Sequence, residues 1–232
     1  MHLHLKELFT KRFYFFMAVV VTAIVSYGFG RAIDTRLLNP PSPRPAILYV
    51  HTFVFSIWII LFLVQTGLLQ ARNIRSHKLI GLFSLPIGGL LPIIGIWVAI
   101  VMSRFNISQG AHDQATALLV PFFDMALFTV LFGLAVYWRK SPEFHKRMMF
   151  LAAASLTVAA FARFPNYLVP KGWFDLGFDA LVLLGIGRDL WIEKRIHKVY
   201  LICLPTIIVG QLATEVVRRT PWWIGVANEI LR

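Results

Sequence analysis

The sequence predicts an all-α fold, a polytopic membrane bundle of seven transmembrane helices. The chain has 232 residues, of which 58% are hydrophobic and only 15% are charged, and its mean hydropathy is +0.70. These values lie outside the range of ordinary soluble domains. Several apolar runs reach the roughly 20 residues that cross a ~30 Å hydrocarbon layer. Only short basic or Pro-rich links separate them, so we expect one transmembrane domain over residues 1–232.

The first predicted helices flank a loop in which no helix can continue. The apolar run 13–30 is too long and too rich in Phe for a secretory signal, so it is predicted to be the first helix. The link 39–45 is rich in Pro, which interrupts helices. The second helix is predicted at 46–70, and a short basic link separates it from the third.

The remaining helices follow from apolar runs between polar links. They are predicted at 78–103, 116–138, 144–167, 173–192 and 199–217. The third helix contains several Pro and Gly residues, which allow kinks and close helix contacts. Residues 218–232, with Trp222 and Trp223, are predicted to form an interfacial tail.

The distribution of Lys and Arg predicts the orientation. Seven crossings place the ends on opposite sides, and most of the 23 Lys and Arg residues fall on the side of the N-terminus. Because cytoplasmic links carry an excess of basic residues, we expect a cytoplasmic N-terminus and a C-terminus outside. The +12 charge is therefore interpreted as topological. No nucleic-acid motif accompanies it, and the expected partner is the lipid bilayer.

Three histidines at one membrane level form the first candidate site. His77, His145 and His197 each precede a Lys near the start of an odd-numbered predicted helix. Imidazole ligates haem iron and divalent metals, so these residues could bind haem b or a divalent metal ion. The alternative is that they simply occupy the polar interface, where residues in water incur no burial cost. Four arginines nearby could pair with haem propionates: Arg72, Arg75, Arg147 and Arg195.

The second candidate site is a buried polar cluster in the non-cytoplasmic half of the bundle. Counted at ~1.5 Å per residue from the helix ends, its titratable members lie at similar depth. A pocket of this kind could bind a small anion, a metal ion or a quinone-like head group. The other open interpretation is a structural ion-pair set in which Arg163 neutralises Asp124 or Asp179. The cluster comprises His51, Trp58, Asp124, Arg163, Asp179, Gln211 and Glu215.

No familiar catalytic motif identifies a reaction. The chain lacks a phosphate-gripping Gly-rich loop, Gly-x-Ser-x-Gly, His-Glu-x-x-His and Cys-x-x-Cys. Cys203 is the single cysteine, so neither a disulfide framework nor a cysteine-based metal site is available. Whether the protein is an enzyme stays open at this point.

Short patterns connect the chain with a known group of proteins. They are His51 with Trp58, the segment His77-Lys-Leu-Ile-Gly81, and His145-Lys-Arg-Met-Met149 with Arg163 downstream. On these, the chain resembles over most of its length a family of bacterial seven-helix membrane proteins without an established activity. The resemblance implies a location in the bacterial inner membrane. At Arg195-Ile-His197-Lys198 the chain departs from the family by having Lys in place of Pro. The short His-basic-x-x-Gly pattern at the start of a predicted helix also looks like part of some cytochrome b561-type haem proteins.

Three function classes remain open from the sequence. The favoured one is a cofactor-binding redox protein, because it accounts for three histidines at one level and the basic groups beside them. The others are a non-catalytic subunit of a larger membrane complex, and a small-solute or proton-coupled transporter that uses the buried polar cluster.

Overall fold

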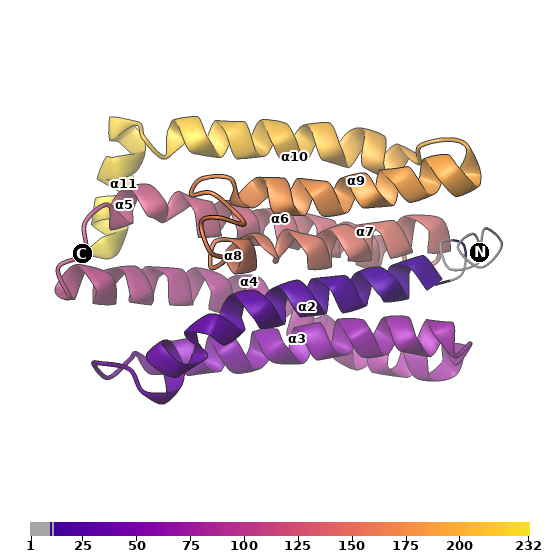
Figure 1. Ribbon diagram of the computed structural model, residues 1–232, viewed down its shortest axis with the longest axis horizontal. Helices are drawn as coiled ribbons and strands as arrows, with labels where there is room; N and C mark the ends of the chain where they lie inside the picture. Colours follow the sequence, from indigo (N-terminus) through magenta and orange to yellow (C-terminus); the bar gives the residue numbers. More distant parts are fainter. Residues whose placement is uncertain (1–9, 11) are drawn as a thin grey trace.

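The computed structural model describes residue 10 and residues 12–232, and no strand occurs among them. Long helices lie side by side along one axis and alternate in direction (Figure 1). The first turn of α2 and the C-terminal helix α11 lie at opposite ends of this bundle. The elements are α2 (Phe13–Ile33), the π-helical turn η2 (Asp34–Leu38), α3 (Ala46–Gln70), α4 (Ile74–Ser108), α5 (Gln114–Ala117), α6 (Leu119–Tyr137), α7 (Pro142–Ser155), α8 (Val158–Phe161), α9 (Phe174–Glu193), α10 (Lys198–Val217) and α11 (Pro221–Leu231).

Five helical segments are long and apolar enough to cross a membrane. They are Phe13–Leu38, Ala46–Gln70, Ile74–Ser108, Gln114–Tyr137 and Lys198–Val217. Their outward faces carry large apolar side chains such as Phe53, Leu82 and Val209, which is the surface that a lipid bilayer covers. The protein thus has the helices of an integral membrane protein. The predicted crossings at 144–167 and 173–192 are not among the five, and seven crossings stay a prediction.

The predicted helix at 144–167 is interrupted in the structure. α7 ends at Ser155 and the short α8 begins at Val158. At this break the hydroxyls of Ser155 and Thr157 donate to the carbonyls of Ala152 and Ala154 at 2.9 and 2.6 Å. Side-chain hydroxyls that bond nearby carbonyls compete with the helical ladder, which accounts for the break.

Helix α7 lies at the centre of the bundle. It packs against α2, α6, α9 and α10, and the segment from Phe150 to Ala154 is at most 1% exposed. The alanines on α7 let its neighbours approach closely. Residues at the first turn of α7 therefore face several helices at once.

The predicted interfacial tail contains an ordered helix, α11. Thr220 caps it by accepting from the backbone N–H of Trp223 at 3.2 Å. The Trp223 indole N–H donates to the carbonyl of Ala115 at 3.0 Å, and Arg104 donates to the carbonyl of Ile230 at 2.6 Å. These contacts fasten α11 across the ends of α4 and α5.

Candidate functional site

The first turn of α7 organises the end of the bundle at which α2, α4, α7 and α10 begin (Figure 1). We call this the basic end. Four consecutive residues, Phe144 to Arg147, project about 100° apart around the helix. Each therefore contacts a different part of the bundle. Phe144 packs on the ring of His197 with centroids 4.8 Å apart, and the next three residues reach other helices.

His145 connects α7 with α6 and α4. Its Nδ1 lies 2.8 Å from the carbonyl oxygen of Ala135. Because a carbonyl only accepts hydrogen bonds, Nδ1 carries the proton and Nε2 of the neutral ring has a free lone pair. The ring lies against that of His77 on α4, with centroids 6.5 Å apart and planes at 78°.

His77 is oriented by Gln65 of α3. The Gln65 amide is oriented so that both its nitrogen and its oxygen have partners. The NH2 group then donates to His77 Nδ1 at 2.5 Å, and the oxygen accepts from the backbone N–H of Gly81 at 2.8 Å. Nδ1 of His77 is then an acceptor, and its proton resides on Nε2. The two histidines consequently have complementary tautomers, with an N–H on His77 and a lone pair on His145.

His197 lies in the link between α9 and α10, where it has a capping role. Its Nδ1 accepts from the backbone N–H of Val199 at 3.2 Å. Burial, followed by the charge of Arg147, lowers the pKa of His197 below its ordinary 6.5. The structure therefore brings His77 and His145 together and places His197 on Phe144. Within the described part of the chain, no group of three or more His, Cys, Asp or Glu side chains could hold a metal ion.

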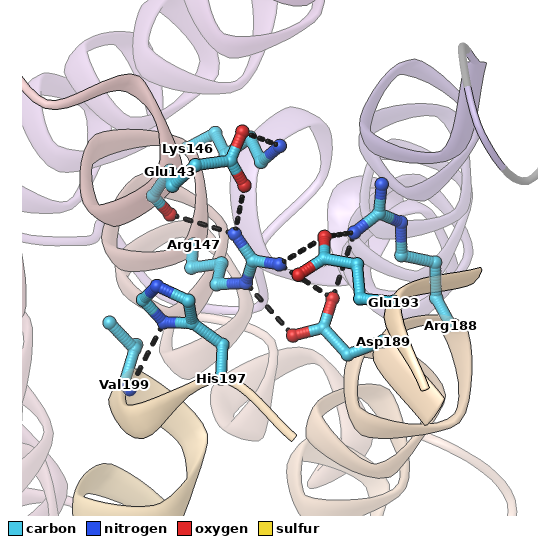
Figure 2. A network of polar contacts seen from close by, with 8 residues as sticks. All are labelled: Glu143, Lys146, Arg147, Arg188, Asp189, Glu193, His197 and Val199. Carbon is cyan, nitrogen blue, oxygen red and sulfur yellow. Dashed lines mark hydrogen bonds and ion pairs between the residues drawn. The ribbon is translucent and has the colours of Figure 1, made fainter. Parts of the chain in front are cut away.

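Arg147 forms the centre of a buried ionic network (Figure 2). Its side chain and that of Asp189 on α9 are both 0% exposed. Nε and Nη2 of Arg147 donate to the two carboxylate oxygens of Asp189 at 2.9 and 2.7 Å. Nη2 also donates to Glu193 at 2.7 Å, and Nη1 donates to the carbonyl and carboxylate of Glu143 at 3.0 and 2.6 Å. The guanidinium has five N–H donors, and it makes five hydrogen bonds.

Two further cations take part in this network. Arg188 donates to Asp189 at 2.8 Å and to Glu193. Lys146 pairs with Glu143 at 2.6 Å and lies 5.5 Å from the ring centroid of Tyr14 on α2. Among the residues that the structure describes, three cations thus face three carboxylates. The network borders an open groove of about 650 Å³ lined by Glu143, Lys146, Arg188, Glu193, Arg195 and His197.

Sequence reasoning missed this network. It interpreted Arg188 as a topological charge and Arg147 as a topological charge or a partner of haem propionates, and it did not single out Asp189 or Glu193. A usable signal was present, because Arg188-Asp189 is a charged pair within the segment 180–192, which is otherwise apolar. Charges in such a segment usually pair or serve a function.

The buried polar cluster is divided between two places. Asp179 on α9 accepts from Gln211 on α10 at 3.1 Å, and Asp124 on α6 is buried. Glu215 instead pairs with Arg218 at 2.5 Å and with Arg219. The carboxylates Asp124 and Asp179 therefore belong to the α6, α9 and α10 side.

Arg163 lies elsewhere, which corrects the expected ion pair. Its guanidinium donates to the carbonyl of Ala159 and lies 4.2 Å from the ring centroid of Phe29 on α2. Among the described residues, no ion pair joins it to Asp124 or Asp179. The reason is the direction of the side chain, because Arg163 follows α8 at its contact with α2 and its guanidinium lies on Phe29 of α2 instead of turning towards α6 or α9.

His51 and Trp58 lie seven residues apart on one side of α3. The His51 ring packs on Phe55 with centroids 4.1 Å apart. Trp58 is 2% exposed and packs edge-on against Phe128 and Phe132 of α6. In the part of the chain that the structure describes, His51 Nδ1 and Trp58 Nε1 are buried and have no partner.

Comparisons with known proteins add no family. Searches of family models, curated proteins and solved structures found no match to this chain. Its function is therefore inferred from the geometry of the site.

Proposed function

We propose that this integral membrane protein binds haem b through His77 and His145 and serves in membrane redox chemistry. One observation carries the proposal. The two imidazoles come from helices far apart in sequence and meet with centroids 6.5 Å apart, while the protein holds Nδ1 of each. Two imidazoles that share a metal at roughly 2 Å from each nitrogen have centroids about 6 Å apart.

The ligand set favours haem over a divalent metal ion. Haem iron needs only axial ligands from the protein, whereas zinc sites take three or four side chains. The described residues provide a pair of histidines and no group of three. His145 also has the backbone carbonyl partner that metal-ligating histidines use to fix their orientation.

Ligation by His77 requires a change at Gln65. A metal-binding Nε2 must be unprotonated, so the proton of His77 has to move to Nδ1. The Gln65 amide, which donates to Nδ1, must then rotate to present its oxygen. Gln65→Leu should therefore weaken the binding of haem without removing a ligand.

An absorption spectrum of the purified protein, with metal analysis of the same sample, tests the proposal. We expect a Soret band and reducible α-bands in the wild type, and their loss in His77→Ala and in His145→Ala. His112→Ala is the matched control, because His112 is exposed in the link between α4 and α5. Full haem occupancy in the double variant, or wild-type protein without haem from haem-replete cells, would contradict the proposal.

A second candidate is proton-coupled transport, which the complementary tautomers favour. His77 presents an N–H and His145 a lone pair on adjacent rings that are nearly perpendicular, and such a pair can pass a proton. In proteoliposomes with a trapped pH dye, the wild type would then conduct protons and His145→Gln would not. Equal proton flux in the two would exclude this role for the pair.

A further inference from the structure

The open groove at the basic end is separate from the pair formed by His77 and His145, neither of which lines it. Its volume of about 650 Å³ lies within the range of pockets that hold small ligands. Its lining residues come from the start of α7, the end of α9 and the link before α10. In the described part of the chain these side chains are all polar: Glu143, Lys146, Arg188, Glu193, Arg195 and His197. A ligand of this groove is therefore polar or charged.

The carboxylates that line the groove are already neutralised by the buried network (Figure 2). Glu143 accepts from Lys146 and from Arg147, both at 2.6 Å. Glu193 accepts from Arg147 at 2.7 Å and from Arg188. The network holds three cations and three carboxylates among the described residues, so its charges balance. A cationic ligand would have to displace one of these ion pairs.

Arg195 adds a positive charge that the network does not balance. It is exposed and lines the groove, and within residues 10 and 12–232 it forms no ion pair. Lys194 precedes it and ends α9 with a left-handed φ of 56°. His197 follows it, accepts from the backbone N–H of Val199 at 3.2 Å and packs on Phe144. These contacts keep the backbone of Arg195 beside the groove.

Lys146 is a second cation that a ligand in the groove can reach. Its side chain is 25% exposed, whereas that of Arg147 is 0% exposed. An ammonium group has three N–H donors, and one of them bonds Glu143. Lys146 therefore retains donors for a ligand. Two cations from different elements, Lys146 of α7 and Arg195 of the link before α10, thus line one open groove.

We infer that this groove binds a phosphate-type anion, with Arg195 and Lys146 as its principal contacts. A guanidinium binds two oxygens of a phosphate at once, and an ammonium group binds a further oxygen as a point charge. The anion offsets the charge of Arg195 that the network leaves unbalanced. The same chemistry fits a soluble phosphate and the head group of an anionic phospholipid. The basic end is predicted to face the cytoplasm, the side on which basic pockets between transmembrane helices bind anionic head groups.

Protection of Arg195 from phenylglyoxal tests the inference on the full chain. The purified protein in neutral detergent is treated with the reagent, and labelled arginines are mapped by peptide mass spectrometry. The probes are sodium phosphate against sodium chloride at equal ionic strength, and phosphatidylglycerol against phosphatidylcholine in mixed micelles. At a probe concentration about tenfold above its dissociation constant, labelling of Arg195 should slow by about tenfold. Arg139 is the internal control, because it is exposed at the same end and does not line the groove.

Two lysine variants test whether the groove holds the anion. Lys146→Gln removes a cation from the groove and should weaken the protection of Arg195 several-fold, with Arg195 still reactive. Lys140→Gln removes an exposed cation from the same end that does not line the groove, and it should leave the protection unchanged. Equal losses of protection in the two variants would contradict a site in the groove.

The pattern of protection identifies the source of the anion. Slowing by inorganic phosphate supports a soluble ligand, and slowing by phosphatidylglycerol alone supports a lipid head group. Labelling of Arg195 that neither probe slows, or that phosphatidylcholine slows as much as phosphatidylglycerol, would overturn the inference. Equal slowing at Arg139 would overturn it as well, because it would show general screening of the basic end.

Discussion

Replacing Asp189 by Asn should destabilise the protein by about 3 kcal/mol. The variant keeps the shape of the side chain but removes the negative charge that faces Arg147, whose side chain is 0% exposed. The Asn amide group would also point N–H donors at guanidinium N–H groups. Removal of one partner from a buried pair costs about 3–5 kcal/mol. We expect a loss of stability at the lower end of this range, because Glu143 and Glu193 still accept hydrogen bonds from Arg147.

The free energy of unfolding in mixed micelles, measured by titration with a denaturing detergent, checks this value. Lys146→Gln is the matched control from the same network. Its partner Glu143 is 55% exposed, so we expect a loss below about 1 kcal/mol. The double variant Arg147→Met with Asp189→Leu should recover most of the loss, since apolar residues of similar volume replace buried pairs well. If Asp189→Asn is as stable as the wild type, the reasoning is refuted.

Three further predictions concern other parts of the bundle. Burial lowers the pKa of His197 below 6.5 in the folded chain. As the pH falls below about 6.5, the unfolded chain therefore takes up a proton at this residue first, and the free energy of unfolding declines. In unfolding titrations, His197→Gln should remove this decline. Gly28→Ala should cost about 2 kcal/mol or more, because its Cβ would meet a backbone carbonyl, whereas Gly30→Ala on the same helix has open space and should be neutral or stabilising in the same assay. Asp124→Asn should not rescue Arg163→Ala in detergent melts, because the two residues form no ion pair, and a rescue would contradict that geometry.

Apolar runs predict the helices well where the chain provides sharp boundaries. The second helix was expected at 46–70, and α3 covers Ala46–Gln70, because Pro45 precedes it and a basic link follows. α4 extends beyond the predicted 78–103 at both ends, since polar residues such as Arg75 and Asn106 still fit a helix outside the apolar layer. The break between α7 and α8 depends on local bonds of Ser155 and Thr157, which the apolar pattern does not contain.

The candidate sites were predicted only in part, because sequence position indicates depth but not neighbours. His77 and His145 were expected at one level, and they do lie against each other. His197 shares that level and nevertheless packs on Phe144. Equal depth likewise suggested Arg163 as the partner of Asp124, but the packing of α8 places the guanidinium on Phe29. Which helix faces which is a tertiary property, and it decides every one of these contacts.

The depth that the hairpin of α7, α8 and α9 reaches in the membrane determines the number of crossings, but it does not affect which side of the membrane each end of the chain lies on. α7 begins and α9 ends at the basic end (Figure 1), so the hairpin enters and leaves on the same side. The 14 residues of α7 extend only about 21 Å, which is less than a ~30 Å hydrocarbon layer. α9 is longer but carries Arg188 and Asp189, and Asp189 pairs with both Arg188 and Arg147. Pairing reduces the cost of these charges in the bilayer.

Together with the five apolar segments, a hairpin that crosses the membrane twice gives seven crossings, and a hairpin that turns back within it gives five. Both numbers are odd, so the assignment of the basic end to the cytoplasm depends on its Lys and Arg residues and not on the depth that the hairpin reaches.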